Sequence, residues 1–408
     1  MRLDRTIERL LLFVGCTLLP NAVVHAREPA DVFERIELVS PGKSVDPTDE
    51  RTPTHRAIKV RVLVEAEDGG LLVEHDDERL EILQPENIAR RELVPRTAPD
   101  GRPPAATTVK AAQRAEAARL LAELPDGFQC IFTKHYCICH DTSVGYATWC
   151  GGLLERLHGA FDNFWSRNGL PITHRNRPLL VIIFRDRATF AANGADRLGA
   201  AVARVAGFYD IMTNRIMTYD LSGSAADPRG FSGSPGDVAM LRNPATAGLV
   251  STLVHEATHQ MAFSTGIHRR LAAIPVWVSE GMACYFETPD LESTSGWKGI
   301  GRINAERLER WRSGWRPGML QSIVEDDGVF RSEEGALDAY SSAWALTYYL
   351  LQSRREDYIR YLGLLQEKIP LTPDSPEGRI EDFQRAFHES PAEMEPAFVR
   401  FMARQRQP

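Results

Sequence analysis

In the first part of the chain, apolar residues alternate with charged or polar ones at Ile58, Val60, Val62 and Val64. A period of two is typical of a strand with one buried face. Asp68-Gly69-Gly70 predicts a turn, and short apolar runs over 71–73 and 80–83 predict two further strands. We therefore expect a small β module over residues 27–94, folded as a meander or a barrel-like unit.

The alternation stops at a proline-rich stretch, residues 95–110, which we interpret as a linker. An amphipathic pattern follows over 111–124 and ends at Pro125-Asp126-Gly127, so residues 95–128 are expected to comprise a linker and one helix.

Residues 129–408 mix strand and helix patterns and form the main predicted domain. We expect a strand over 130–138, a strongly apolar central strand over 179–184 and a hairpin built from 204–210 and 215–221. Apolar residues at helical spacing predict helices over 149–169, from Pro244 to Gly266, and over 275–287, 304–312, 339–351 and parts of 355–401. The fold class predicted for the chain is therefore α+β.

The first 26 residues resemble an export signal. Arg2, Arg5 and Arg9 precede an apolar run over 10–19, and Val24-His25-Ala26 is an acceptable cleavage site. Lipidation at Cys16 is the alternative. The apolar run is too short for a membrane anchor, and no other run reaches spanning length, so we expect an exported protein, periplasmic or extracellular, with no transmembrane segment after signal removal.

Composition narrows the classes of function. The chain has 408 residues, 43% of them apolar and 25% charged, which is ordinary for a globular protein. A net charge of −7 without a long basic run argues against nucleic-acid binding. In an exported chain, one or two disulfides are plausible, and buried free thiols are the alternative, among Cys130, Cys137, Cys139 and Cys150. Cys284 is interpreted as a small core residue.

The chemistry of the chain centres on Val254-His255-Glu256-Ala257-Thr258-His259-Gln260. Residues four apart lie on one face of a helix, so His255 and His259 can bind one metal ion, while Glu256 can hold a water against it. Asn243 and Pro244 suit the start of this helix and Gly266 its end.

The next predicted helix, 275–287, is apolar but carries Glu280, twenty-one residues after His259. A buried carboxylate is costly unless it is paired or binds a metal. Two histidines and one glutamate leave a coordination position open, as in a catalytic zinc site. His268 is an alternative third ligand, but it adjoins Arg269 just past the helix end, and we expect it to be solvated. The metzincin pattern is absent, since it requires glycine at 262 and histidine at 265, where the chain has alanine and threonine.

These two segments are similar to gluzincin-type zinc metallopeptidases. The chain more closely resembles the peptidase MA-like group, which includes a bacterial domain-of-unknown-function family with a His-Glu-x-x-His-Gln helix and a Trp-x-x-Glu-Gly-x-Ala-x-Tyr-Phe-Glu helix. The resemblance spans about 133–399. It implies a thermolysin-like core, Zn²⁺ on His255, His259 and Glu280, and Glu256 as general base.

The resemblance carries further expectations and one departure. An edge strand near the cleft would pair with extended substrate, and the 204–221 hairpin is our candidate. Tyr340 is a candidate for stabilising the developing oxyanion, with core packing as the alternative. Many gluzincins support a ligand histidine with an acidic residue one turn after the third ligand. Here Ala283 and Cys284 occupy those positions, so Glu287 is the candidate substitute.

The sequence therefore favours an exported zinc-dependent peptidase acting on peptides or proteins. Two alternatives stay open: a non-catalytic envelope or binding protein that keeps the zinc fold, and a metal-dependent hydrolase of a non-peptide amide. Residues 222–238, rich in Gly, Ser, Pro and Asp, are expected to form a loop that acts as a lid or is cleaved on activation.

Overall fold

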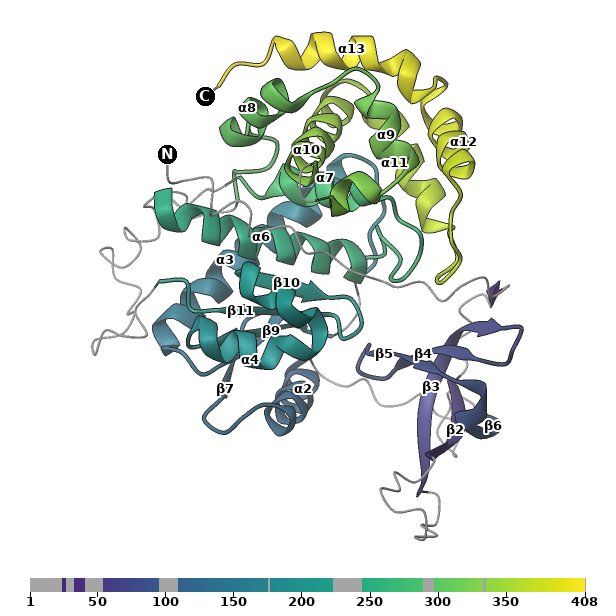
Figure 1. Ribbon diagram of the computed structural model, residues 1–408. Helices are drawn as coiled ribbons and strands as arrows, with labels where there is room; N and C mark the ends of the chain where they lie inside the picture. The colour runs from purple at the N-terminus through teal and green to yellow at the C-terminus, as the bar shows by residue number, and fades with distance from the viewer. Residues whose placement is uncertain are drawn as a thin grey trace.

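The computed structural model describes residues 24–26, 33–40, 54–94, 109–174, 177–222, 244–288, 297–332 and 335–407. Most of the predicted export signal (residues 1–23 of 1–26), most of the predicted linker (95–108) and residues 223–238 of the predicted loop lie outside these ranges. The described chain is α+β, as predicted, with an N-terminal β module and a larger mixed domain (Figure 1). No helix in the described ranges is long and apolar enough to cross a membrane.

The N-terminal module is a six-stranded sheet of order β5-β4-β3-β2-β6, with β1 paired to β3. All its pairings are antiparallel. Its alternating apolar residues, including Ile58, Val60 and Val62, form the predicted buried face. The strands are β1 (Val24–Ala26), β2 (Phe33–Ser40), β3 (Thr54–Ala66), β4 (Leu71–His75), β5 (Leu80–Leu83) and β6 (Ile88–Val94), with the 3₁₀ turn η1 (Pro85–Asn87) before β6.

The module is attached to the larger domain by specific polar contacts. The Arg270 guanidinium donates to a Glu74 carboxylate oxygen at 2.8 Å and to the Glu78 carbonyl at 2.7 Å. The amide N–H of Leu80 donates to the Met212 carbonyl at 2.7 Å. Charge-assisted bonds to partly buried groups are among the stronger ones, so this junction is well defined.

A second, five-stranded sheet has the order β10-β11-β9-β8-β7. Its strands are β7 (Gln129–Phe132), β8 (Tyr136–His140), β9 (Leu179–Phe184), β10 (Gly207–Asp210) and β11 (Arg215–Tyr219). Strands β8, β9 and β11 are parallel, and the edge strands β7 and β10 are antiparallel to their neighbours. The central position of β9 and the β10–β11 hairpin are confirmed.

The single strand predicted over 130–138 is wrong. The chain turns at residues 133–135 and returns as β8, and Glu155 holds this turn through hydrogen bonds from Thr133 and His135. A disulfide joins Cys130 to Cys139 across the hairpin. Cys137, Cys150 and Cys284 are free and buried. The prediction of a disulfide among the four candidates is therefore confirmed for one pair.

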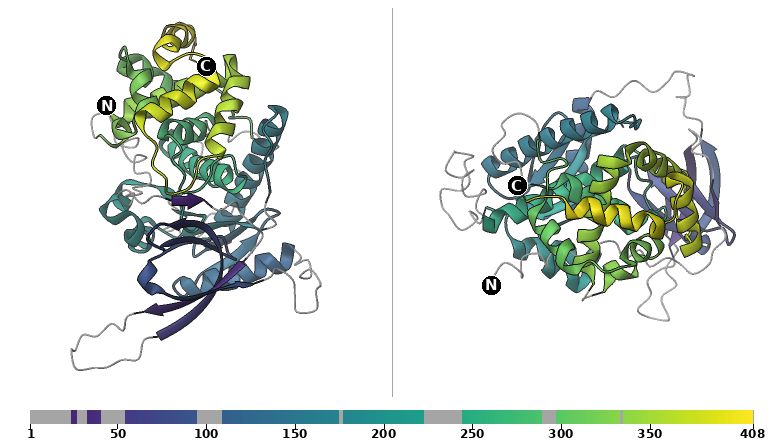
Figure 2. Two further views of the ribbon diagram at one scale, coloured as in Figure 1. Left: turned by 90° about the vertical axis from the view of Figure 1, so that its right-hand side faces the viewer. Right: turned by 90° about the horizontal axis from the view of Figure 1, so that it is seen from above.

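Helix α6 (Pro244–Ser264) lies between the five-stranded sheet and a layer of C-terminal helices (Figures 1 and 2). Next to the sheet lie α2 (Val109–Glu123), α3 (Val144–Arg167), α4 (Arg187–Leu198) and η2 (Gly199–Arg204). The helical layer contains α7 (Val276–Phe286), α8 (Ala305–Gly314), α9 (Met319–Glu325), η4 (Gly328–Arg331), α10 (Ala336–Ser353), α11 (Arg355–Gln366), α12 (Pro376–Phe387) and α13 (Pro391–Ala403). One large apolar cluster connects α3, α6, α7 and α10.

Candidate metal centre

Helix α6 begins at Pro244 and ends at Ser264, close to its predicted bounds. Gly266 follows with φ of 80°, a backbone conformation that glycine adopts without strain, so it stops the helix. The apolar face, with Leu253, Val254 and Ala257, is buried in the core. That packing fixes the rotation of the helix and therefore the direction of His255 and His259.

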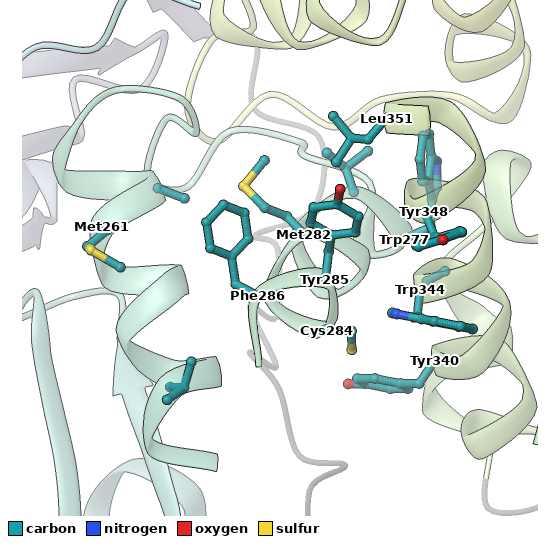
Figure 3. Close-up of a cluster of buried hydrophobic side chains, with 14 of the residues drawn as sticks. Met261, Trp277, Met282, Cys284, Tyr285, Phe286, Tyr340, Trp344, Tyr348 and Leu351 are labelled. Carbon is teal, nitrogen blue, oxygen red and sulfur yellow. The ribbon is translucent and has the colours of Figure 1, made fainter. Parts of the chain in front are cut away.

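Helix α7 supplies Glu280 and packs very closely on α10. At Gly281, a β-carbon would lie 2.2 Å from Thr347 Oγ1 and 2.6 Å from the Ala343 carbonyl oxygen. Only glycine permits this approach. Figure 3 shows the surrounding aromatic packing, with Trp277 and Tyr285 on α7 and Trp344 on α10. The close contact positions Glu280, the preceding residue, relative to the rest of the core.

The structure brings His255, His259 and Glu280 together, with each side chain almost fully buried. His255 Nε2 lies 3.0 Å from Glu280 Oε2, and His259 Nε2 lies 3.3 Å from Glu280 Oε1. The two Nε2 atoms are 3.1 Å apart. Two imidazole nitrogens facing each other at this distance share at most one proton, so at least one of them presents a lone pair to the other side chains.

These separations fit a metal ion. Ligand atoms about 2.0–2.1 Å from a tetrahedral zinc lie roughly 3.3–3.4 Å from one another. The three observed separations of 3.0, 3.1 and 3.3 Å are close to that spacing. The donor set of two imidazoles and one carboxylate also suits zinc and leaves a coordination position for water or substrate. The three residues could therefore hold a metal ion.

Glu287 supports His255 from the C-terminal end of α7, where it is the residue directly after Phe286. Its Oε2 accepts a hydrogen bond from His255 Nδ1 at 2.7 Å, which turns Nε2 of the same ring toward the metal position. Its Oε1 accepts from Arg307 Nε at 2.6 Å on α8. The substitute carboxylate suggested by the sequence is therefore in place, and Arg307 is a further supporting residue for which the sequence offered no signal.

Positive charge beside Glu256 and Glu280 can come from the two imidazoles or from a bound cation. Arg307 pairs with Glu287, but neither Glu256 nor Glu280 has a lysine or arginine within ion-pair distance in the described ranges. Burial alone would lower the pKa of His255, yet contacts with Cys284, Glu280 and Glu287 raise it well above its usual range. Burial would raise the pKa of Glu280, but His259 and His255 hold it well below its usual range. The carboxylates around His255 and His259 thus favour positive charge at the point where the two imidazoles and Glu280 meet.

Glu256 lies beside the three candidate ligands and at the edge of the sheet. Its Oε2 accepts a hydrogen bond from the amide N–H of Tyr209 at 2.8 Å. Tyr209 belongs to β10, the edge strand, so the predicted hairpin does run past the predicted base. Burial raises the pKa of the Glu256 carboxyl, although His255 and His259 oppose the rise. A general base is most effective when its pKa lies near the working pH, so this rise brings the pKa of Glu256 closer to the value suited to neutral pH.

Tyr340 is buried at the start of α10, and its ring meets Phe330 edge to face at 5.5 Å. Figure 3 shows it beside Cys284, extending from α10 toward α7. Burial, together with the charges of Glu280 and Glu256, raises the pKa of its hydroxyl well above the usual range. Tyr340 therefore packs in the core and lies close enough to the site for its charges to shift the pKa of the hydroxyl. These observations are compatible with both interpretations made from the sequence, core packing and stabilisation of the oxyanion.

The expectation of a solvated His268 is wrong. Only 1% of this residue is exposed, because the chain folds back after α6 and the His268 amide donates to the Ala262 carbonyl at 2.9 Å. Its ring packs against Phe263, and neither ring nitrogen has a hydrogen-bond partner among the described residues. Burial and the positive charge of His259 lower the pKa of His268 to about 3. In the described ranges it does not group with the three candidate ligands, so Glu280 is the better third ligand.

A comparison with protein families matches the part of the chain that contains these residues. A family model described as a protein of unknown function (DUF1570) matches residues 249–372. The matched segment includes His255, Glu256, His259 and Glu280, together with α7 and α10. A comparison with curated proteins finds no match. The chain is therefore similar to DUF1570 over the segment that carries the candidate metal centre.

Proposed function

We propose that this protein is an exported zinc-dependent peptidase. The observation that carries the proposal is the placement of two buried carboxylates, Glu280 between two imidazoles and Glu256 beside them, with no lysine or arginine within ion-pair distance among the described residues. A divalent ion would balance these charges, and a carboxylate held next to such an ion is the arrangement that metal-assisted amide hydrolysis requires. The Cys130–Cys139 disulfide supports an oxidising compartment outside the cytosol.

In this proposal His255, His259 and Glu280 would hold the ion. Bound zinc would acidify its water and polarise the scissile carbonyl. Glu256 takes a proton from the attacking water and later delivers it to the leaving amine. The Tyr209 amide holds Glu256 Oε2, which leaves Oε1 for that proton transfer.

Two further groups support the chemistry. Glu287 keeps the ring of His255 oriented through the 2.7 Å bond to Nδ1. The Tyr340 hydroxyl is proposed to donate a hydrogen bond to the carbonyl oxygen as negative charge develops on it. Strand β10 is the edge of the sheet, and an extended peptide that paired with it would pass Glu256.

The test is a peptide-library digest by zinc-loaded parent and Glu256→Gln proteins. Loss of a general base costs roughly 10²–10⁴-fold in rate, so we expect cleavage by the parent that a chelator abolishes, and little cleavage by the variant. The variant should retain its zinc, because Glu256 is not a ligand. Undiminished cleavage by Glu256→Gln, in a preparation free of contaminating protease, would refute the assignment of the base. Zinc in both proteins with cleavage by neither would instead support a non-catalytic protein that keeps the zinc fold.

A further inference from the structure

A second group of metal-binding side chains lies outside the candidate centre. His158 and Asp162 are four residues apart on α3, and His174 follows on the segment after that helix. His158 Nδ1 lies 3.3 Å from Asp162 Oδ2, and His174 Nε2 lies 3.4 Å from the same oxygen. All three ligand atoms lie within 4.8 Å of one another. The two measured separations match the spacing of ligands around one tetrahedral ion, roughly 3.3–3.4 Å.

The arrangement is not explained by hydrogen bonding within the group. His158 is only 5% exposed, yet its Nδ1 has no hydrogen-bond partner in the described ranges. Asp162 Oδ1 is also buried and without a partner there. Leaving a buried polar atom unsatisfied costs about 1–3 kcal/mol, so two such atoms in one group indicate a missing binding partner.

The side chains around the group keep its ligand atoms in position. The ring of His135 stacks on that of His158, with centroids 3.9 Å apart and planes 4° apart. His135 itself is paired with Glu155 at 2.7 Å. The amide of Thr173 donates to the Thr265 carbonyl at 3.0 Å, which ties the segment carrying His174 to the end of α6. The ligands therefore come from two elements that are each independently anchored.

The group opens into a cavity of about 330 Å³. Other residues lining it include Glu78 of the β module and the basic residues Lys134 and Arg177. Arg177 forms an ion pair with Glu116, so part of the positive charge is already compensated. The cavity leaves room for water or a small ligand to complete the coordination of an ion.

We propose that His158, Asp162 and His174 form a second metal site, separate from the candidate centre on α6 and α7. Two imidazoles and one carboxylate suit a divalent first-row transition ion such as Zn²⁺. An ion bound there would link α3 to the 170–174 segment. That segment is hydrogen-bonded to Thr265, just after α6, the helix that carries His255 and His259. The second site would therefore stabilise the position of the C-terminal end of α6.

The test is zinc content after loading and gel filtration, measured on the full chain and on variants. His174→Ala removes an exposed ligand, its side chain being 49% exposed, so the variant should fold. Asp162→Asn keeps the shape of the second ligand. His388→Ala, at an exposed histidine elsewhere, is the matched control. We expect about two zinc ions in the parent and in His388→Ala, and about one in His174→Ala and in Asp162→Asn.

Glu280→Ala separates this proposal from the proposed function. If both hold, it also retains about one ion, and the double variant with His174→Ala retains none. If only the second site exists, the parent carries about one ion, which His174→Ala loses and Glu280→Ala keeps. A titration should show affinity at this site weakened by more than roughly tenfold in His174→Ala, since even residues that only orient ligands contribute 10–100-fold. Unchanged zinc content and affinity in both His174→Ala and Asp162→Asn, or binding of inorganic phosphate in place of zinc, would overturn the proposal.

Discussion

Replacing Glu287 with alanine should weaken both the fold and the metal centre. The carboxylate accepts hydrogen bonds from His255 at 2.7 Å and from Arg307 at 2.6 Å. The side chains of Glu287 and His255 are 4% and 3% exposed, and that of Arg307 is 14% exposed. Alanine therefore leaves a mostly buried guanidinium without its partner.

The magnitude follows from this burial. Removing one partner of a buried ion pair costs about 3–5 kcal/mol, and the residual exposure of Arg307 places the expected loss of unfolding free energy near the lower end, about 3 kcal/mol. Zinc affinity should fall separately by roughly 10–100-fold, because His255 loses the group that orients its ring. Glu287→Gln keeps the size and one acceptor, so both effects should be smaller.

Two measurements separate these effects. Denaturant unfolding of the metal-free proteins reports the stability loss, and zinc titration against a competing chelator reports the affinity loss. If Glu287→Ala unfolds at the same denaturant concentration as the parent and binds zinc equally tightly, Glu287 neither pairs with Arg307 nor orients His255, and this part of the reasoning is refuted.

Two other predictions test the supporting geometry. Gly281→Ala should cost about 1–3 kcal/mol of unfolding free energy, since the added methyl forces α7 away from α10. The control is Gly248→Ala, at an exposed position of α6 where nothing lies within 4 Å of the added atom. It should be neutral or stabilising by up to about 1 kcal/mol. Equal thermal stability of the two variants would contradict the close contact between α7 and α10. Tyr340→Phe should lower kcat of the proposed peptidase by roughly 10²–10³-fold with zinc content unchanged. An unchanged kcat would show that Tyr340 only packs in the core.

Local sequence signals predicted the elements that carry the site. Proline is favoured in the first turn of a helix and glycine just after its end, and Pro244 and Gly266 hold these places at α6. The apolar run over 179–184 had to be buried on both faces, and β9 is indeed central. The carboxylate at 280 drew attention because charge is costly in an apolar helix, and it lies between the two histidines.

The features that were missed depend on contacts between distant residues. His268 follows a helix end beside two arginines, which suggests exposure, but the chain folds back and buries its ring against Phe263. The turn at 133–135 is held by Glu155, twenty or more residues away along the chain. No local pattern joins His158 and Asp162 to His174. Such pairings appear only when the packing of helices and segments is known.

The most direct test of the central claim is the zinc content of Glu280→Ala compared with its parent, both carrying His174→Ala to remove the second proposed site. Circular dichroism of both proteins would check that the fold is kept. The account predicts about one zinc ion per chain in the parent and almost none in Glu280→Ala. Equal zinc in the two proteins would contradict it, because Glu280 would then not be a ligand of the ion held by His255 and His259.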